Sequence, residues 1–377
     1  MLSSPNIAVL PSRRLLRIPA TLMRGGTSKC VIFRAEDLAG HDIALDDILL
    51  SAFGSVDPSQ VDGVGGATST TSKAAVVSPS SQPGVDVEFL FAQVGIGDQV
   101  VEYGSNCGNC ATAVGLHAIQ TGLVTPRAGT TVVRMLNLNT GTLLTAAVAT
   151  EHGAVPECGD ALVPGSVSRT GVPVALGFVD PVGRTTGRLL PSGHAVDVVG
   201  ALEVTFVDAG APAMFIDAGG FGASTIEGAR EAASELVSLR RQGAVRMGLV
   251  PPGAPTPDVI PKVGLVAPPT AYTTTSGRRV GADEYDVSVR MMSMFAPHPA
   301  IGLTSAVALA AAAVTPGTVP NRIVGGGVAS TIRLGTAAGV VELGTRVDGA
   351  GVLREVVFQR VARRIATMEL FVPCGGG

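Results

Sequence analysis

Two residues in the first half of the chain combine a reactive side chain with a local sequence that favours acid/base chemistry. Cys107 lies in Ser-Asn-Cys-Gly-Asn, just ahead of an apolar stretch that predicts a helix, and Lys73 follows Thr68-Ser-Thr-Thr-Ser72 and enters Ala-Ala-Val-Val. The unpaired amides and positive dipole end of a helix favour a thiolate, so we expect the thiol pKa of Cys107 to fall. A lysine at the mouth of a buried strand can lose its charge by desolvation and act as a base near neutral pH.

Each of these residues also has a purely structural interpretation. Free cysteines are commonly small buried side chains, and a lysine at a sheet edge commonly blocks pairing with another chain. The turn-forming Asn and Gly around Cys107 favour function, whereas for Lys73 taken alone the two interpretations are evenly balanced. Cys110 lies one helical turn further along and is assigned to core packing. The Cys-x-x-Cys pair has neither a second pair of zinc ligands nor a thioredoxin-like strand before it, so we favour neither a zinc site nor a redox dithiol.

Several neighbouring residues are candidates for binding a carboxylate substrate. Amides at a helix start bind anions, and successive amides of a Gly-Gly-Thr-Ser turn form a small anion nest beside a lysine and an arginine. The candidates in the first half are Arg24, Gly26, Thr27, Ser28, Lys29, Ser72, Asn106, Gly108 and Asn109.

The chain also repeats itself, passing three stations in the same order in each half. Each half has an apolar hairpin, a lysine entering a strand that ends at proline, and a turn that opens an apolar helix; the stations are 23–33 and 207–216, 72–79 and 261–268, and 104–117 and 298–311. Three ordered matches at separations of about 184 to 197 positions indicate a duplication. The repeat sets Lys262 opposite Lys73, as a cation for a carboxylate, and sets Thr304, followed by Ser305, roughly opposite Cys107.

These patterns predict an α+β fold of two pseudosymmetric domains, residues 1–195 and 196–377. We expect each domain to be a curved, mostly antiparallel sheet around one central helix, because the remaining segments are short, β-branched and punctuated by Gly and Pro. The crossover is expected near Leu190–His194. A helix over 353–366 and a strand over 369–372 are expected to close the chain, with this last segment packing back on the first domain.

Composition excludes several classes of partner. With 46% hydrophobic residues, 15% charged residues and a net charge of −3, the chain has no electrostatic reason to bind nucleic acid or an anionic membrane. The most apolar run, 306–314, is far shorter than the ~20 residues of a membrane span. Five cysteines without scaffold spacing and no secretory h-region predict free thiols in the cytoplasm. No metal-binding spacing or dinucleotide motif is present, so we expect neither metal nor cofactor.

Five motifs together resemble the PrpF family, whose members include aconitate isomerases, 3-methylitaconate isomerases and 4-oxalomesaconate tautomerases. The motifs are Met23-Arg-Gly-Gly-Thr-Ser-Lys29, Gly65-Gly66 leading to Thr71-Ser-Lys73, Asn106-Cys-Gly-Asn109, Leu190-Pro-Ser-Gly193 and Arg290-Met-Met-Ser-Met294. The resemblance implies the diaminopimelate-epimerase-like fold, an active site between two helix N-termini, and Lys73 and Cys107 as the acid/base groups. Where family members usually read Ser-Lys-Gly, this chain has Cys30 after Lys29.

The predicted activity is a cofactor-independent 1,3-allylic proton shift on a small unsaturated di- or tricarboxylic acid, such as aconitate, methylitaconate or 4-oxalomesaconate. Alternatives are a keto–enol tautomerase, an amino-acid or imino-acid racemase, epimerase or dehydratase of the same fold, and a non-catalytic carboxylate-binding protein. A threonine opposite Cys107 is a poor base, which disfavours a racemase with two cysteines. The expected partner is the small polycarboxylate, and a homodimer is compatible with the sequence.

Overall fold

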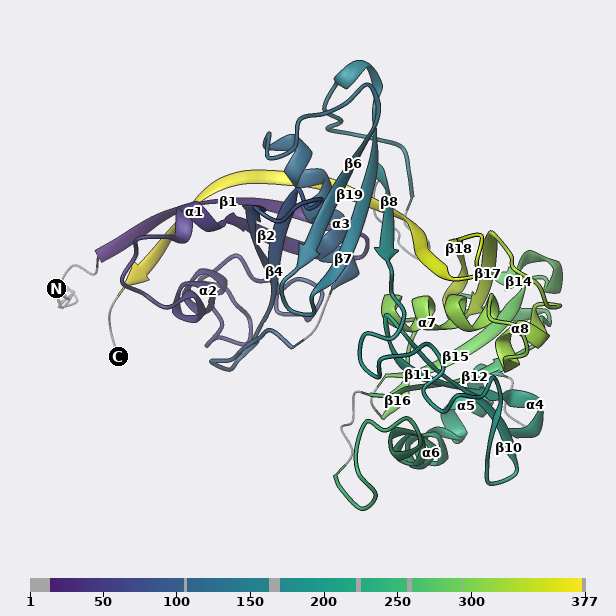
Figure 1. Cartoon of the computed structure of the whole chain (residues 1–377). Helices are drawn as coiled ribbons and strands as arrows, with labels where there is room; N and C mark the ends of the chain where they lie inside the picture. The colour runs from purple at the N-terminus through teal and green to yellow at the C-terminus, as the bar shows by residue number, and fades with distance from the viewer. Residues whose placement is uncertain are drawn as a thin grey trace. The chain divides into compact units, whose positions relative to one another are not determined.

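Figure 1 shows the computed structural model of the chain, which describes residues 14–104, 107–162, 170–221, 225–255, 260–293 and 295–374. Contacts divide the chain into two compact units that interleave along the sequence: unit 1 holds residues 1–126, 135–141 and 362–377, and unit 2 holds residues 127–134 and 142–361. The sequence-based division is instead a single cut at 195/196. The expected crossover at Leu190–His194 contains a turn within unit 2, in which the Gly193 amide donates to the Leu190 carbonyl.

Unit 1 is a mixed sheet with helices on it. Its elements are β1 (Arg14–Gly25), β2 (Ser28–Arg34), α1 (Ala35–Leu38), α2 (Leu45–Phe53), β3 (Lys73–Pro79), β4 (Val87–Val94), β5 (Val101–Glu102), α3 (Gly108–Gln120), the end of β6 (Gly129–Asn137) and the end of β19 (Leu353–Cys374). β1 pairs antiparallel with β2 and β19, and β4 pairs antiparallel with β3 and β5. β2 runs parallel to β3, and β4 runs parallel to β6.

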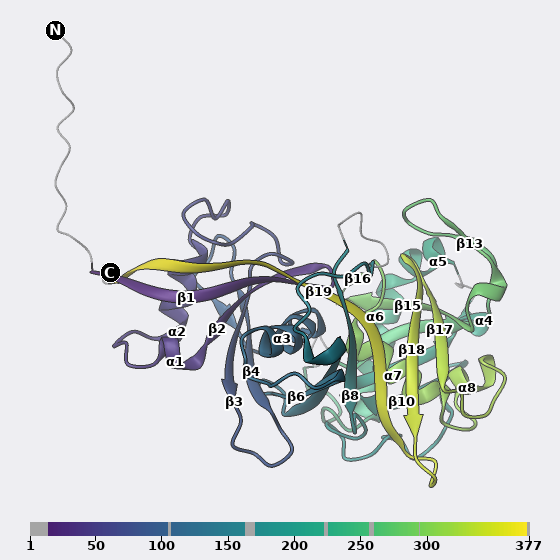
Figure 2. The same cartoon turned by 90° about the horizontal axis from the view of Figure 1, so that it is seen from above.

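Two helices cover opposite faces of the unit 1 sheet. Val31 and Phe33 of β2 belong to a core cluster that includes residues of α2. Because successive side chains of a strand point to opposite faces, Cys30 and Ile32 lie on the other face. That face packs against α3, which contacts β1 to β4 and is surrounded by strands in Figures 1 and 2. Helix α3 is buried nearly all round, so it is a central helix rather than a surface one.

Unit 2 has the same arrangement. Its strands are the start of β6, β7 (Thr142–Thr150), β8 (Val172–Val179), β9 (Asp197–Val199), β10 (Leu202–Ala209), β11 (Ala211–Asp217), β12 (Lys262–Ala267), β13 (Tyr272–Thr273), β14 (Arg279–Val280), β15 (Val287–Ser293), β16 (Ala296–Pro297), β17 (Thr331–Thr336), β18 (Gly339–Val347) and the start of β19. Its α-helices are α4 (Ala218–Phe221), α5 (Ile226–Glu231), α6 (Ala233–Arg246), α7 (Leu303–Ala313) and α8 (Val319–Ile323). Buried α7 contacts β10 and β11, and α6 contacts β12 (Figure 1).

The order of strand pairings confirms the predicted duplication. In unit 1 the pairs β1–β2, β2–β3, β3–β4 and β4–β6 are antiparallel, parallel, antiparallel and parallel. In unit 2 the pairs β10–β11, β11–β12, β12–β15 and β15–β17 follow the same series. A short paired strand, β5 or β16, precedes the central helix in each unit. The α+β class and the curved, mostly antiparallel sheets around one helix are therefore confirmed.

The C-terminal helix predicted over 353–366 is wrong, because the whole segment belongs to the long strand β19. Val357, Val361 and Ile365 recur every four residues, which mimics one face of a helix. These residues are also β-branched, and β19 finds backbone partners in β18 and then in β1. Tertiary pairing thus overrides the local pattern. The strand's final part, which pairs with β1, lies in unit 1.

Candidate active site

Lys73 is the first residue of β3 and lies on the face of the sheet that carries α3. Its neighbour Ala74 belongs to the cluster on the α2 face, so the lysine side chain points the other way. In the ladder Lys73 pairs with Gln93 of β4, and its Nζ donates a hydrogen bond of 2.5 Å to Gln93 Oε1. The same Nζ lies 5.2 Å from the centroid of the buried Phe91 ring. The half-buried amine is thus held between an amide oxygen and an aromatic face.

Cys107 is the N-cap residue of α3, as the sequence predicts for a residue ahead of the helix. Its backbone is extended, with φ −115° and ψ 101°, and its carbonyl accepts the amide of Ala111 at 2.9 Å. The cysteine is half-buried, whereas Cys110, one turn further along, is fully buried. Cys110 therefore packs in the core, as expected.

The predicted fall in the thiol pKa of Cys107 is wrong. Its pKa lies well above the ordinary value because its thiol is hydrogen-bonded to that of Cys110 and because burial disfavours the thiolate. The nearby charge of Lys73 and the Cys110 amide act in the opposite direction but do not prevail. Helix-end amides favour a thiolate only when no stronger local interaction holds the proton. Cys107 is therefore a thiol, suited to donate a proton.

A sulfur cluster connects β2 to the start of α3. The buried Cys110 thiol is hydrogen-bonded to Cys107 and to Cys30, and burial raises its pKa well above the ordinary value. The charge of Lys73 lowers the pKa of both Cys107 and Cys110, which means that the ammonium and the two thiols act on one another within unit 1. The structure thus brings together the two residues that the sequence selects for proton transfer.

The turn between β1 and β2 packs directly against the first turn of α3. The Asn109 amide Nδ2 donates to Thr27 Oγ1 and Ser28 Oγ, each at 3.2 Å. A Cβ built on Gly25 would lie 1.8 Å from the Asn109 backbone oxygen, so this position accepts only glycine. Gly26 has φ +51° and faces the Asn109 side chain. Thr27 is exposed, which leaves its hydroxyl available to a ligand.

The remaining first-half candidates lie around this turn. The Lys29 amide donates to the Thr70 carbonyl at 2.9 Å, and a Cβ built on Gly66 would lie 3.3 Å from Lys29 Nζ. Lys29 therefore faces the loop that leads to Lys73. Arg24 donates to the Gly26 carbonyl at 3.2 Å, and burial and Arg363 lower its pKa. Gly108 is the first residue of α3, while Asn106 lies outside the described residues.

Ser72, which the sequence predicts to bind substrate, instead has a buried side chain. Its side chain is fully buried and donates to Gln60 Oε1 at 2.6 Å. Gln60 also accepts the Ala67 amide at 2.8 Å and donates to the Gly95 carbonyl at 3.2 Å. Ser72 therefore fixes the loop before β3, and through it the start of the strand at Lys73.

The second-half candidates lie in unit 2. Lys262 begins β12 beside Ala213, and burial and Arg240 lower its pKa. Burial lowers the pKa of His298, just ahead of α7; the hydrogen bond with the Ala300 amide acts in the opposite direction, and the charge of Lys262 lowers the pKa. Thr304 and the buried Ser305 are the second and third residues of α7, whose N-cap is Gly302. By helix position the counterpart of Cys107 is therefore Gly302, which corrects the predicted alignment with Thr304.

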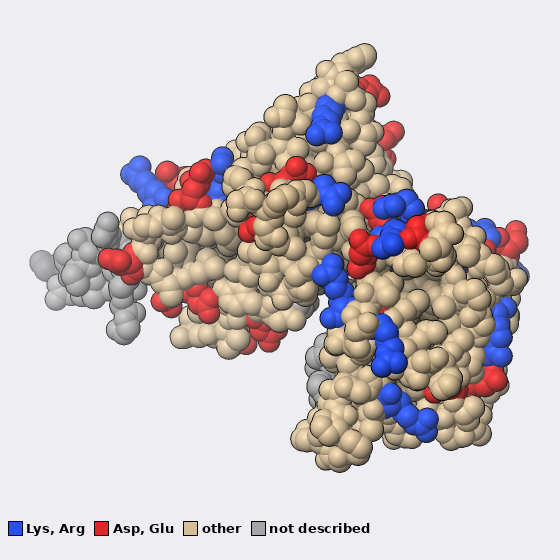
Figure 3. Space-filling view, viewed as in Figure 1, with Lys and Arg blue, Asp and Glu red and all other residues tan. Residues whose placement is uncertain are grey.

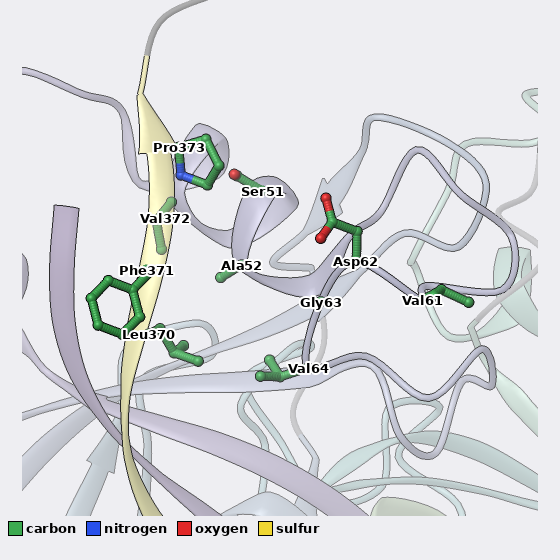
Figure 4. A pocket seen from close by; sticks show the side chains of 10 residues that line it. All are labelled: Ser51, Ala52, Val61, Asp62, Gly63, Val64, Leu370, Phe371, Val372 and Pro373. Carbon is green, nitrogen blue, oxygen red and sulfur yellow. The ribbon is translucent and has the colours of Figure 1, made fainter. Parts of the chain in front are cut away.

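Other kinds of site have less support. Among the described residues, no group of three or more His, Cys, Asp or Glu side chains is arranged to hold a metal ion. Unit 1 has a cavity of about 290 Å³, lined by the end of α2, residues 61–64 and the end of β19. Figure 4 shows the side chains that line it. Asp62 is the one charged residue among the ten that line it, and none of the predicted site residues is among them.

Comparison with known proteins identifies the family. Residues 15–373 match the family described as PrpF protein. The chain belongs to the PrpF family. It is 37% identical to a 2-methyl-aconitate isomerase of Shewanella oneidensis, over 95% of this chain and 96% of that protein. It is also 37% identical to a (4E)-oxalomesaconate Delta-isomerase of Novosphingobium sp. (strain KA1), over 96% and 99%.

A solved structure extends the comparison to three dimensions. The crystal structure of a methylitaconate-delta-isomerase superposes with a TM-score of 0.88 at 32% identity, covering 96% of this chain and 98% of that one. This PrpF-family protein is accordingly an isomerase. In the part of the chain that the structure describes, no helix is long and apolar enough to cross a membrane.

Three site residues of this PrpF-family protein escape prediction from the sequence: Gln93, Phe91 and Gln60. The first two contact the Lys73 amine, and Gln60 organises the loop before it. Gln93 and Phe91 alternate with the buried Ala92 and Val94, which shows that they share a face. Their contacts with Lys73 depend on the register between β3 and β4, which pairs Gln93 with Lys73 and Phe91 with Ala75, and for which the sequence carries no separate signal.

Proposed function

We propose that Lys73 and Cys107 catalyse a 1,3-allylic proton shift on a small unsaturated di- or tricarboxylic acid. The observation that carries the proposal is the placement of the two residues: Cys107 is the N-cap of α3, and Lys73 begins β3 on the face of the sheet that α3 contacts. Relatives named for 2-methyl-aconitate, 3-methylitaconate and oxalomesaconate support this class of substrate.

The reaction begins when Lys73, as a neutral amine, takes a proton from the allylic carbon. The electron pair moves through the double bond into the conjugated carboxylate, forming a dienolate, and Lys73 becomes an ammonium. Cys107 then gives its thiol proton to the far carbon and becomes a thiolate, so that the double bond has moved by one position. Proton return from the Lys73 ammonium to the thiolate restores the starting state.

The surroundings of the two residues suit this sequence of steps. The raised pKa of Cys107 keeps its proton in place until a strong base, the dienolate carbon, accepts it. Backbone amides at the start of α3, with the positive end of the helix dipole, stabilise charge on the substrate carboxylate. Thr27, Ser28, Lys29 and Asn109 line the turn against that helix end and are assigned to substrate binding with Arg24, Gly26 and Gly108. Binding roles for Asn106, Lys262, Thr304 and Ser305 stay predictions.

A racemase is the less favoured reaction. Racemases of this kind need an acid/base group on each face of one carbon, and the position in α7 equivalent to Cys107 is Gly302, which has no side chain. Asn109 Nδ2 and the hydroxyls of Thr27 and Ser28 would bind a carboxylate equally well in a non-catalytic protein. Only the activity of mutants can therefore distinguish an enzyme from a binding protein.

The free cysteines and the surface charges bear on the cellular compartment and the partners of the protein. We propose that it works in the cytoplasm, because Cys110 is hydrogen-bonded to both Cys30 and Cys107, and neighbouring free thiols persist best in a reducing compartment. The face in Figure 3 carries small groups of both charges among mostly uncharged residues, which does not resemble a nucleic-acid surface. A homodimer, and a division into folding domains at 195/196, stay predictions.

The test is incubation with 2-methylaconitate, 3-methylitaconate and 4-oxalomesaconate in D₂O, with double-bond migration and deuterium uptake followed by NMR. We expect Lys73→Met and Cys107→Ala each to lower turnover by at least about 100-fold, the scale of losing a positioned acid/base group. Cys158→Ala, at an exposed cysteine, is the matched control and should keep wild-type turnover. Near-native rates in both site variants would refute the mechanism, and ligand binding without turnover in the wild type would indicate a binding protein.

A further inference from the structure

Gln93 holds the proposed base in a single orientation. The residue pairs with Lys73 across the β3–β4 ladder, and its side-chain oxygen accepts from Lys73 Nζ at 2.5 Å. Within the described residues no carboxylate forms an ion pair with Lys73. The polar contact of the amine is therefore with a neutral amide, which accepts an N–H without adding a charge.

The Gln93 amide cannot turn over to present its nitrogen to Lys73. Its Nε2 donates to the Ser72 carbonyl at 2.9 Å, which a reversed amide would face with an oxygen. Ser72 is itself fixed, because its buried hydroxyl donates to Gln60 Oε1 at 2.6 Å. The chain of contacts from Gln60 through Ser72 to Gln93 thus fixes the direction of the oxygen that meets Lys73 Nζ.

Phe91 limits the amine on a second side. The ring is 1% exposed, and its centroid lies 5.2 Å from Nζ. The Phe91 amide and carbonyl are both bound at 2.8 Å by the Asn139 side chain, so the residue has a fixed backbone. With Gln93 and Phe91 on two sides, Lys73 has one remaining direction in which to present a lone pair, away from both of these partners.

Unit 2 has no glutamine at the position equivalent to Gln93. In unit 2 the ladder between β12 and β15 ends at the pair Gly264–Met291, and continuing its register by two residues would set Ser293 opposite Lys262. Ser293 is exposed and its side chain is shorter than glutamine by two carbon atoms. The amide partner is thus a feature of the lysine to which we assign the base, and not of every lysine at this station.

We propose that Gln93 is a positioning residue for the isomerase reaction, which orients Lys73 toward the substrate and keeps it free of a carboxylate partner. The inference rests on the proposed function of Lys73. Gln93 does not itself touch the reacting carbons. A negative charge at position 93 would hold Lys73 as an ammonium. An apolar side chain of similar length would remove the hydrogen bond that orients the Lys73 amine.

The test compares Gln93→Glu, Gln93→Met and the control Gln359→Glu, an exposed glutamine in β19, by the pH dependence of kcat/KM. We expect Gln93→Glu to move the acidic limb at least about one pH unit upward, so that the rate near neutrality falls about 10-fold and recovers at higher pH. Gln93→Met should lower kcat about 10-fold or more, with a smaller change in KM and no upward movement of the limb. The control should follow the wild-type profile.

The outcomes separate this inference from the proposed function. If Lys73→Met is inactive but both Gln93 variants keep the wild-type profile and kcat, the role of Gln93 is refuted and the base assignment survives. If Lys73→Met keeps near-native turnover, the assignment of the base to Lys73 fails, and with it the basis of this inference. Since a second carboxylate oxygen would face the Ser72 carbonyl, thermal unfolding of each variant checks its fold, and should Gln93→Glu fail to fold, an unchanged kcat in Gln93→Met refutes the inference by itself.

Discussion

His117 makes the stability of α3 sensitive to acid. The side chain is 2% exposed, and within the described residues neither ring nitrogen has a hydrogen-bond partner. Burial, with the charges of Arg364 and Arg34, lowers its pKa from 6.5 to about 4. The unfolded chain therefore binds a proton at a higher pH than the folded protein does. The stabilisation is complete above pH 6.5 and is lost as the pH falls toward 4.

The size of the effect follows from the two pKa values. A change from 6.5 to about 4 corresponds to roughly 3 kcal/mol in total. About 2 kcal/mol of this should be lost between pH 7 and pH 5, since the unfolded histidine is by then mostly protonated and the folded one mostly neutral. Because α3 carries Cys107 at its N-cap, its unfolding would also abolish activity.

Urea unfolding at pH 7 and pH 5 measures this loss in the wild type, in His117→Leu and in His194→Leu, which replaces an exposed histidine. The leucine at 117 is apolar and cannot titrate, so His117→Leu should lose about 2 kcal/mol less than the wild type over this interval. His194→Leu should behave like the wild type. Equal losses in His117→Leu and the wild type would refute the assignment of acid sensitivity to this histidine.

Two further predictions concern the site. Gly25→Ala should reduce turnover by at least about 10-fold, because the new Cβ would lie 1.8 Å from the Asn109 oxygen and must displace the first turn of α3. The control is Gly349→Ala, where no atom lies within 4 Å of the added Cβ. Unchanged turnover in Gly25→Ala would contradict the packing argument. Isomerase activity should persist after exhaustive chelation, as measured by the NMR assay with EDTA; loss that a divalent metal reverses would overturn a metal-free reaction.

The sequence predicts the topology of the site well because duplication supplies a second copy of each signal. Lys73 and Lys262 both begin a strand that runs parallel to its predecessor, and α3 and α7 both follow a short paired strand. A hairpin, a strand and a buried helix each have their own residue pattern, and the agreement between halves makes chance similarity improbable. Helices α2 and α6 lack such matching motifs, so the sequence gives no comparable signal for them.

Predictions based on local patterns are wrong where burial or a side-chain or strand contact formed on folding decides the outcome. Local sequence around Cys107 indicates a helix end and hence a low thiol pKa, but the contact with Cys110 and burial reverse the direction. The helical spacing around Val361 gives way to pairing with other strands. Gln93 becomes part of the site only through the register of β3 against β4. Register, burial and side-chain contact are properties of the assembled fold, so one sequence alone does not specify them.

The long strand β19 is shared by the two units of the duplicated protein. Its first part completes the sheet of unit 2 beside β18, and its last part completes the sheet of unit 1 beside β1. A fragment ending at residue 195 would leave β1 as an unprotected edge, and a fragment starting at residue 196 would lack β7 and β8 of unit 2. Neither half of the gene therefore encodes all the strands of one unit. Two separately expressed fragments, 1–195 and 196–377, would have to complement each other by strand donation to recover the fold. Splitting the gene between the two halves would therefore not produce two complete units unless the β19 segment were also moved in the sequence.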